Sequence, residues 1–299
     1  MISPVYDMPH TPASAGAADR GLDREAVARA AGLDASRIEI VPVTGSTNQD
    51  LLDGPPVPDA LAPRVLIAVR QRAGRGRRGR AWLSEPPDCL TMSISLHRVR
   101  EASAPPLTGL PLALGVAIAE TLAPQVHGIG LKWPNDLLRD GRKCAGMLVE
   151  VRALAELERV VIGLGLNWRL PCSLAQQLLA AAGGSPPFAA AGGLFDELAP
   201  APVREQITGQ LARALIERAR RFMREGFGDT ALRWARFDAL LGREVVVRGD
   251  GTHVLVGRAD GLDRHGALRV RTADGVQSVC AGEVSVRLAG DAQPRGCET

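Results

Sequence analysis

The chain has 299 residues, of which 45% are hydrophobic and 23% charged, and its formal net charge is +3. This length allows one large domain and a small one, and so modest a charge excludes a protein built to coat nucleic acid with its whole surface. The five cysteines are scattered, which argues against a disulfide framework and fits a reducing cytoplasm. No signal peptide is expected, and no apolar run reaches membrane-spanning length.

The N-terminal segment is predicted to add little to the core. Residues 1–21 combine small residues with prolines and should be disordered. Residues 22–32 predict one short helix capped by Asp23. The alternating apolar residues of 38–43 predict the first strand, so residues 1–37 are expected to form a lead before the main domain.

Short polar side chains follow that strand in the run Gly45-Ser46-Thr47-Asn48-Gln49. Ser46 or Thr47 would cap a helix running through Leu51 and Leu52. The same strand-to-helix corner presents donors and acceptors that can bind a neutral polar ligand. Capping and ligand binding are therefore both predicted here.

An arginine-rich loop, Gln71 to Trp82, comes after a buried strand predicted at residues 65–69. Gly74, Gly76 and Gly79 alternate with five arginines, and glycine lets a main chain approach a ligand closely. Exposed amides and guanidinium groups both suit phosphate oxygens. Because the positive charge is local, the loop predicts a small anionic ligand; the alternatives are a solvated loop and an RNA-binding segment.

Two core elements are predicted next from their hydrophobic period. Residues 90–96 alternate large apolar residues with Thr91, Ser93 and Ser95, which indicates a half-buried antiparallel strand. Residues 107–122 are apolar nearly all round, which indicates a helix buried against the sheet.

A hairpin is predicted where Asp140-Gly141 separates residues 130–138 from residues 142–150. A two-residue turn would pair Arg139 with Arg142, Leu138 with Lys143, and Asp136 with Ala145.

Three charged side chains, Lys132, Asp136 and Lys143, would then project from one face of the hairpin, with Pro134 kinking its first strand. Buried charges are costly unless they are paired or hydrogen-bonded. The pattern predicts either a structural lysine–aspartate ion pair or a site where lysine meets an anionic substrate and Asp136 orients a cation or a hydroxyl.

Residues 160–168 predict a strand with one bare face, formed by Gly163, Gly165 and Asn167. Such a face marks the close approach of a ligand or of another backbone. No helix is predicted after it and a third glycine is missing, so the run is not a dinucleotide-binding fingerprint.

The rest of the chain predicts loop, helices and a small β domain. Residues 171–200 are rich in Ala, Gly and Pro and predict mostly loop, and residues 203–226 and 230–241 predict helices. Short β runs from residue 242 to residue 288 predict a small barrel. Residues 289–299 are expected to form a disordered tail.

Together these motifs resemble those of the biotin–protein ligases, which activate biotin with ATP and attach it to a carrier lysine. The matching runs follow the family's order: Ser46-Thr47-Asn48, Gly74 to Arg80 with Trp82, Lys132 to Asp136, Lys143 with Gly146 and Glu150, and Gly163 to Asn167. The resemblance implies an α+β fold: a mixed β-sheet flanked by helices, the class II synthetase-like biotin/lipoate ligase catalytic domain, over residues 38–241. An SH3-like β-barrel would follow over residues 242–288.

The resemblance also implies roles for single residues. Biotin would contact Ser46, Thr47, Asn48, Gln71, Arg75, Gly76, Arg77, Lys143, Gly146, Gly163 and Gly165. The nucleotide would contact Arg77, Arg78, Arg80, Trp82, Lys132, Asn135, Asp136 and Asn167. Arg77, Lys143 and Asp136 are expected to be catalytic, and no set of metal-ligating side chains is expected.

The implied reaction takes ATP and biotin as substrates, together with Mg²⁺. Its implied partner is a biotin carboxyl carrier protein, a subunit of acetyl-CoA carboxylase or of a similar carboxylase, and homodimers occur in the family. The residues before the first strand lack a winged-helix pattern, so neither DNA binding nor repressor function is expected. The alternatives are a lipoate–protein ligase, against which the arginine run and the barrel argue, and a non-enzymatic nucleic-acid binder.

Overall fold

The computed structural model describes residues 21–55, 62–82, 88–170, 191–196, 203–249, 254–281 and 285–288. The predictions for residues 1–20, for most of the segment 171–200 and for the tail 289–299 lie outside these ranges. No helix in the described ranges is both long enough and apolar enough to cross a lipid bilayer.

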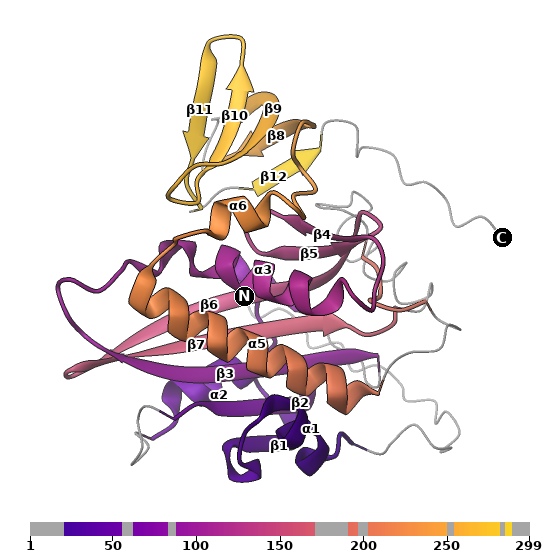
Figure 1. The fold of residues 1–299 in the computed structure, drawn as a ribbon. Coiled ribbons are helices and arrows are strands. Elements are labelled where there is room, and N and C mark those ends of the chain that lie inside the picture. Colours follow the sequence, from indigo (N-terminus) through magenta and orange to yellow (C-terminus); the bar gives the residue numbers. More distant parts are fainter. Residues whose placement is uncertain are drawn as a thin grey trace, which may run out of the picture.

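The main part of the structure is a mixed sheet (Figure 1). Its strands are β1 (Ile38–Thr44), β2 (Arg64–Gln71), β3 (Cys89–Val99), β4 (Ile129–Lys132), β5 (Asp136–Arg139), β6 (Arg142–Leu154) and β7 (Leu157–Asn167). Within the described residues they lie in the order β1-β2-β3-β7-β6-β5-β4. β1 and β2 are parallel and all other neighbours are antiparallel, which confirms the predicted mixed sheet.

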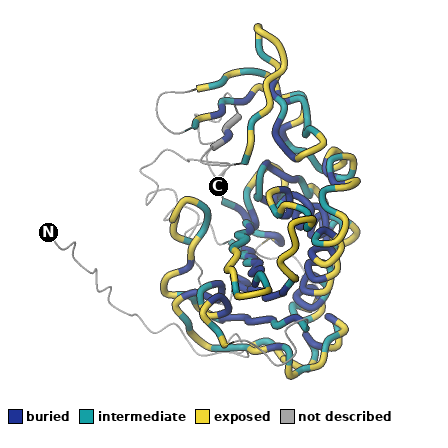
Figure 2. The backbone as a smooth tube through the Cα atoms, turned by 90° about the vertical axis from the view of Figure 1, so that its left-hand side faces the viewer, coloured by how far each residue is buried: buried dark blue, intermediate teal, exposed yellow. Residues whose placement is uncertain are grey.

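Helices cover both faces of this sheet. One face packs against α1 (Arg24–Ala31), α3 (Leu110–Leu122) and α5 (Arg204–Glu225), and together they enclose the main hydrophobic core. Figure 2 shows that buried residues concentrate inside the molecule and exposed residues on its outside. The other face carries α2 (Thr47–Asp53), whose Leu51 and Leu52 pack on Leu66 and Val161 in a separate small cluster. The two faces therefore differ, because only the short α2 among the described helices covers the second one.

Local signals explain where several helices begin and end. The Asp23 side chain accepts hydrogen bonds from two backbone amides of α1, and Gly32 ends that helix with a φ of 66°. Ser46 caps α2 by accepting from the Gln49 amide, as the capping interpretation predicted. The remaining short helices are η1 (Ala35–Arg37), η2 (Arg77–Gly79), η3 (Leu107–Gly109) and α6 (Thr230–Trp234).

Three sequence predictions were wrong in detail. β3 is buried on both faces, because α2 and its neighbours cover the side that carries Thr91, Ser93 and Ser95. The expected kinked strand over residues 130–138 is in fact two strands, β4 and β5, which turn back on each other at a cis Trp133–Pro134 peptide. The helix expected over residues 230–241 ends at Trp234, because the following backbone pairs with Leu131 instead.

The C-terminal part is an antiparallel sheet of short strands, which lies beside α3, α6 and β4 in Figure 1. Its strands are β8 (Glu244–Arg248), β9 (Val254–Leu262), β10 (Leu268–Thr272), β11 (Gly275–Val279) and β12 (Ser285–Leu288), in the order β11-β10-β9-β8-β12 within the described residues. The turn before β10 touches the main domain, where the Trp133 indole N–H donates to the Gly266 carbonyl at 3.1 Å. The two parts therefore share a buried contact.

Candidate active site

A polar network surrounds the N-terminal end of α2. The Thr47 amide donates to Gln71 Oε1 at 2.8 Å, and the Thr47 and Ser93 hydroxyls lie 2.6 Å apart. Asn48 accepts from the Ser93 hydroxyl at 2.6 Å and donates to Glu150 Oε2 at 2.8 Å. Thr47 and Asn48 are almost fully buried. The predicted corner thus presents orientated donors and acceptors, held by three strands.

Two members of this network, Ser93 and Glu150, were not among the predicted ligand contacts. Ser93 belongs to the alternating hydroxyls of β3, which the sequence suggested would be half exposed. Its register places it opposite Gly163, on the bare face of β7. The signal that could have found it was this alternation, read together with the neighbouring glycine strand.

The charged hairpin residues do lie together. Lys143 Nζ is 2.5 Å from Asp136 Oδ1, and Asp136 is paired directly with Lys132 in the neighbouring strand. The Lys143 side chain is 28% exposed and that of Asp136 is 11% exposed. The predicted lysine–aspartate ion pair is therefore present, formed by Lys143 and Asp136. The Lys143 amine also lies beside Gly146, at the edge of the glycine face.

The register of this hairpin corrects one predicted pairing. The turn has both Asp140 and Gly141 at positive φ. As predicted, Arg139 pairs with Arg142 and Leu138 with Lys143. A bulge then intervenes, so Asp136 lies opposite Gly146 rather than Ala145. An extra residue in one strand lets its neighbours change face. Cys144 and Ala145 both enter the core, and Gly146 lies beside the Lys143 amine.

The bulge also fixes the chemistry of Cys144. Burial raises the pKa of its thiol to about 12, so almost no thiolate forms at neutral pH. We expect iodoacetamide at neutral pH to alkylate the exposed Cys280 and to leave Cys144 unmodified in the folded protein. Peptide mass spectrometry before and after denaturation checks this result. Modification of Cys144 in the native protein would contradict the bulge geometry.

The arginine loop reaches across the face between α2 and the β4–β5 turn. An Arg75 Nη atom donates to Gln49 Oε1 and lies 3.9 Å from Glu150. Arg77 donates to Asn135 Oδ1 at 3.3 Å, and Asn135 in turn donates to the Met147 carbonyl. The predicted Arg78 and Arg80 are exposed residues of the loop's turn, where Arg78 has a φ of 60°. The loop thus connects the two parts of the predicted site.

The Trp82 indole lies on the bare glycine face. A Cβ added to Gly165 would come within 2.3 Å of the indole, and one added to Gly146 would come within 3.5 Å. Lys143 Nζ is 5.9 Å from the centre of the same ring, within the range of cation–π attraction. At Gly163 an added Cβ would lie 2.4 Å from Asn48 Oδ1. Other groups do approach these glycines closely, but in this structure they are the side chains of Trp82 and Asn48 and not the predicted ligand or backbone. Contact of a ligand with the glycine face stays a prediction.

Asn167 closes the far end of this face. Its side-chain amide donates to the Gly192 carbonyl at 3.2 Å and its oxygen accepts from the Cys89 thiol at 3.6 Å. Asn167 therefore fastens the segment 191–196 to the sheet in this structure. Its role as a nucleotide contact stays a prediction.

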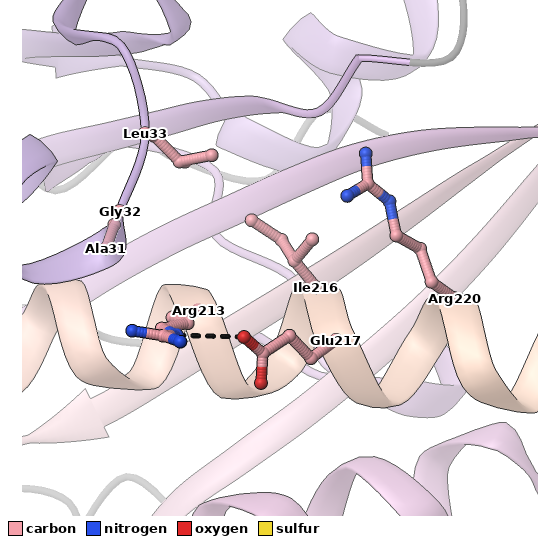
Figure 3. A pocket seen from close by; sticks show the side chains of 7 residues that line it. All are labelled: Ala31, Gly32, Leu33, Arg213, Ile216, Glu217 and Arg220. Carbon is pink, nitrogen blue, oxygen red and sulfur yellow. Dashed lines mark hydrogen bonds and ion pairs between the residues drawn. The ribbon is translucent and has the colours of Figure 1, made fainter.

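A separate pocket lies in the helix layer, between the end of α1 and α5 (Figure 3). Gly32 and Leu33 line one side of it and Ile216 and Arg220 the other. The charges of Arg213 and Glu217 at its rim are satisfied by each other at 2.8 Å. None of the predicted site residues lines this pocket.

Comparison with known proteins gives consistent matches. A family model described as the biotin/lipoate A/B protein ligase family matches residues 40–167, and one described as the biotin protein ligase C-terminal domain matches residues 240–287. The chain is 32% identical to the Escherichia coli bifunctional ligase/repressor BirA, over 86% of this chain and 76% of that protein. It is 33% identical to the Mycobacterium tuberculosis biotin–[acetyl-CoA-carboxylase] ligase, over 83% and 88% of the two chains.

A solved structure shares the fold. A biotin protein ligase from Aquifex aeolicus, in complex with biotin and ATP, matches with a TM-score of 0.64 and 24% sequence identity. The match covers 84% of this chain and 99% of that one.

Proposed function

The chain belongs to the biotin protein ligase family, and from that membership we propose how its site carries out two successive steps. It is an ATP-dependent ligase that activates biotin as biotinyl-5'-adenylate and transfers the biotinyl group to protein. The observation that carries the proposal is the ion pair of Lys143 and Asp136, at 2.5 Å, beside the bare face that Trp82 covers.

In the first step a carboxylate oxygen of biotin attacks the α-phosphorus of ATP, and pyrophosphate leaves with the bonding electrons. Two anions must come together, so the protein has to supply positive charge and fixed positions. We assign this work to Lys143, held by Asp136, and to Arg77, held by Asn135. Arg78, Arg80 and Lys132 are proposed to contact the nucleotide.

In the second step the neutral amine of a carrier lysine attacks the carbonyl carbon of the mixed anhydride. AMP leaves with the electron pair of the broken bond, and the attacking amine gives up a proton. We propose that Asp136 orientates this amine or accepts its proton. The alternative is that Asp136 contacts the nucleotide or its metal ion.

Biotin itself is proposed to lie against the α2 corner. Its ureido ring both donates and accepts hydrogen bonds, and Thr47, Asn48 and Gln71 offer both kinds of group. Ser93, which bonds Thr47 and Asn48, is added to this set. The glycine face would hold the rest of the ligand once the Trp82 indole has moved aside.

We propose that Mg²⁺ binds together with ATP. Proteins bind Mg²⁺ through one or two carboxylates together with substrate phosphates. Asp136 is a carboxylate of the site that fits this use, and the described residues contain no group of three His, Cys, Asp or Glu side chains that could bind a metal ion. When bound, the ion would neutralise phosphate charge.

We also propose a biotin carboxyl carrier protein as the acceptor, because the Mycobacterium tuberculosis relative is named a biotin–[acetyl-CoA-carboxylase] ligase. A buried free thiol such as Cys144 fits a reducing cytoplasm. The absence of DNA binding and the homodimer stay predictions. Lipoate is not favoured as substrate, because residues 240–287 match a domain named for biotin protein ligases.

The decisive experiment incubates the protein with MgATP, a biotinyl carrier domain, and either biotin or lipoate. Intact-mass measurement should show one added biotinyl group, together with pyrophosphate release, and no added lipoyl group. A carrier modified by lipoate alone would make this a lipoate ligase, and a protein that releases no pyrophosphate with either acid would not be a ligase.

A further inference from the structure

A buried arginine lies beneath the C-terminal end of α2. Arg159 of β7 is only 3% exposed, although it carries a full positive charge. Its Nη1 atom donates to the carbonyls of Leu51 at 3.1 Å, Leu52 at 2.9 Å and Gly54, and its Nη2 atom donates to the Pro55 carbonyl at 3.1 Å. Every one of these acceptors belongs to the last turn of α2 or to the residues directly after it.

A second arginine acts at the same place. Arg152 lies opposite Arg159 in the neighbouring strand β6, donates to the Leu52 carbonyl at 2.9 Å and pairs with Asp53 at 2.7 Å. On the other side, in β3, His97 accepts from Arg159 Nε at 3.1 Å. Two guanidinium groups from adjacent strands therefore hold one helix end.

The helix needs such support. The last four carbonyls of any helix have no partner within it, and a helix of only seven residues does not persist by itself in water. Gly54 has a φ of −56°, so the backbone does not form the left-handed cap that often satisfies these carbonyls. Positive charge at a helix C-terminus is favourable. The arginines thus take the place of a backbone cap.

The opposite end of α2 carries the residues assigned to biotin. Thr47 and Asn48 are the first two residues of the helix, and they reach Gln71, Ser93 and Glu150 through the network described above. The apolar side chains of the helix, Leu51 and Leu52, pack on Leu66 and Val161 of the sheet. Apolar contacts of this kind are non-directional, so the orientation of the helix on the sheet depends on the hydrogen bonds at its two ends.

We propose that Arg159, assisted by Arg152, is a positioning residue for biotin, because it anchors the end of α2 that lies away from the ligand and thereby sets where Thr47 and Asn48 stand. The proposal rests on the function proposed above. It concerns the binding of biotin and not the chemical step, since Arg159 touches neither the arginine loop nor Lys143.

The test measures steady-state constants for Arg159→Met, which keeps much of the apolar volume and removes all the donated hydrogen bonds. The KM for biotin should rise about tenfold or more, the equivalent of losing one charge-assisted hydrogen bond. The kcat at saturating biotin and the KM for ATP should stay within about twofold of the wild type, the range of a harmless substitution. Arg159→Lys, which restores a buried donor, should recover part of the affinity for biotin.

Arg98→Met is the matched control. Arg98 is also a largely buried arginine of the sheet, which donates to the Pro105 carbonyl at 2.6 Å and pairs with Glu158 at 2.7 Å, but its described contacts do not include α2. Its loss should leave the KM for biotin unchanged, even if the melting temperature falls.

The outcomes separate the two proposals. A wild-type protein without biotin-dependent pyrophosphate release would refute the proposed function before any variant is compared. With an active wild type, an unchanged KM for biotin in Arg159→Met would overturn the positioning role, and so would an equal rise in Arg98→Met. Should Arg159→Met fail to fold, Arg159→Lys and Arg152→Met decide the question, and normal biotin constants in both would reject the role.

Discussion

Replacing Lys143 with methionine should lower kcat/KM for adenylate formation by about 10²- to 10³-fold, the usual loss when one preorganised charge is removed from a transition state. Lys143 is the amine that borders both Asp136 and the bare glycine face, so its removal leaves the developing negative charge without its closest proposed partner. Biotin-dependent release of pyrophosphate from ATP measures the effect directly.

The same substitution leaves the largely buried Asp136 carboxylate without this cation, so stability should fall by about 1–3 kcal/mol. The double variant Lys143→Met with Asp136→Asn removes both charges, and it should regain most of the stability while staying inactive. Arg142→Met removes an exposed cation next to Lys143 and should change the rate by no more than about twofold. Adenylate formation at the wild-type rate in Lys143→Met would show that the charge is not used.

Replacing Gly165 with alanine should lower adenylate formation by about 10²-fold, which is the scale of a misplacement near 1 Å in a site. The new Cβ would lie 2.3 Å from the present position of the Trp82 indole, so the ring has to leave the sheet. Overpacking of this kind costs about 1–3 kcal/mol of stability. Gly45→Ala is the control, because an added Cβ there meets no atom within 4 Å.

A double-mutant cycle with Trp82→Ala identifies the cause of the loss. If the methyl group acts by displacing the indole, Gly165→Ala should have little further effect once Trp82 is alanine. If the two losses simply add, the methyl group obstructs the ligand itself. Normal activity in Gly165→Ala would mean that the bare face is not part of the site.

Much of the fold could be predicted because local chemistry dictates it. The Asp23 cap and Gly32 enclose α1 as expected, and the Asp140-Gly141 turn starts the β5–β6 hairpin in the expected register. The end of α6 could not be predicted in this way. Beyond Trp234 the sequence still favours helix, but the backbone gains two hydrogen bonds to Leu131 from the neighbouring sheet edge. Tertiary pairing overrides local propensity there.

Most residues of the candidate site could be predicted from the sequence, but the contacts between them could not. The alternation of residues in β6 does not predict the bulge. The bulge is seen only in the structure, where the adjacent residues Cys144 and Ala145 are both buried in the core. The sequence likewise could not show that Trp82 would lie on Gly165, because strand pairing does not fix the position of a loop residue over a sheet. Arg159 lies outside every recognised motif, and its role depends on a helix more than a hundred residues earlier in the chain.

The placement of the two hairpin lysines has a consequence for the enzyme's own surface. Lys132 and Lys143 are the only lysines in the sequence, and every other one of its 36 lysine and arginine side chains is a guanidinium. An acyl-adenylate acylates neutral amines, whereas arginine stays protonated at any physiological pH. Since Lys132 is only 3% exposed and Lys143 is paired with Asp136, reactive intermediate that escapes into solution finds hardly any side-chain amine on the protein that made it.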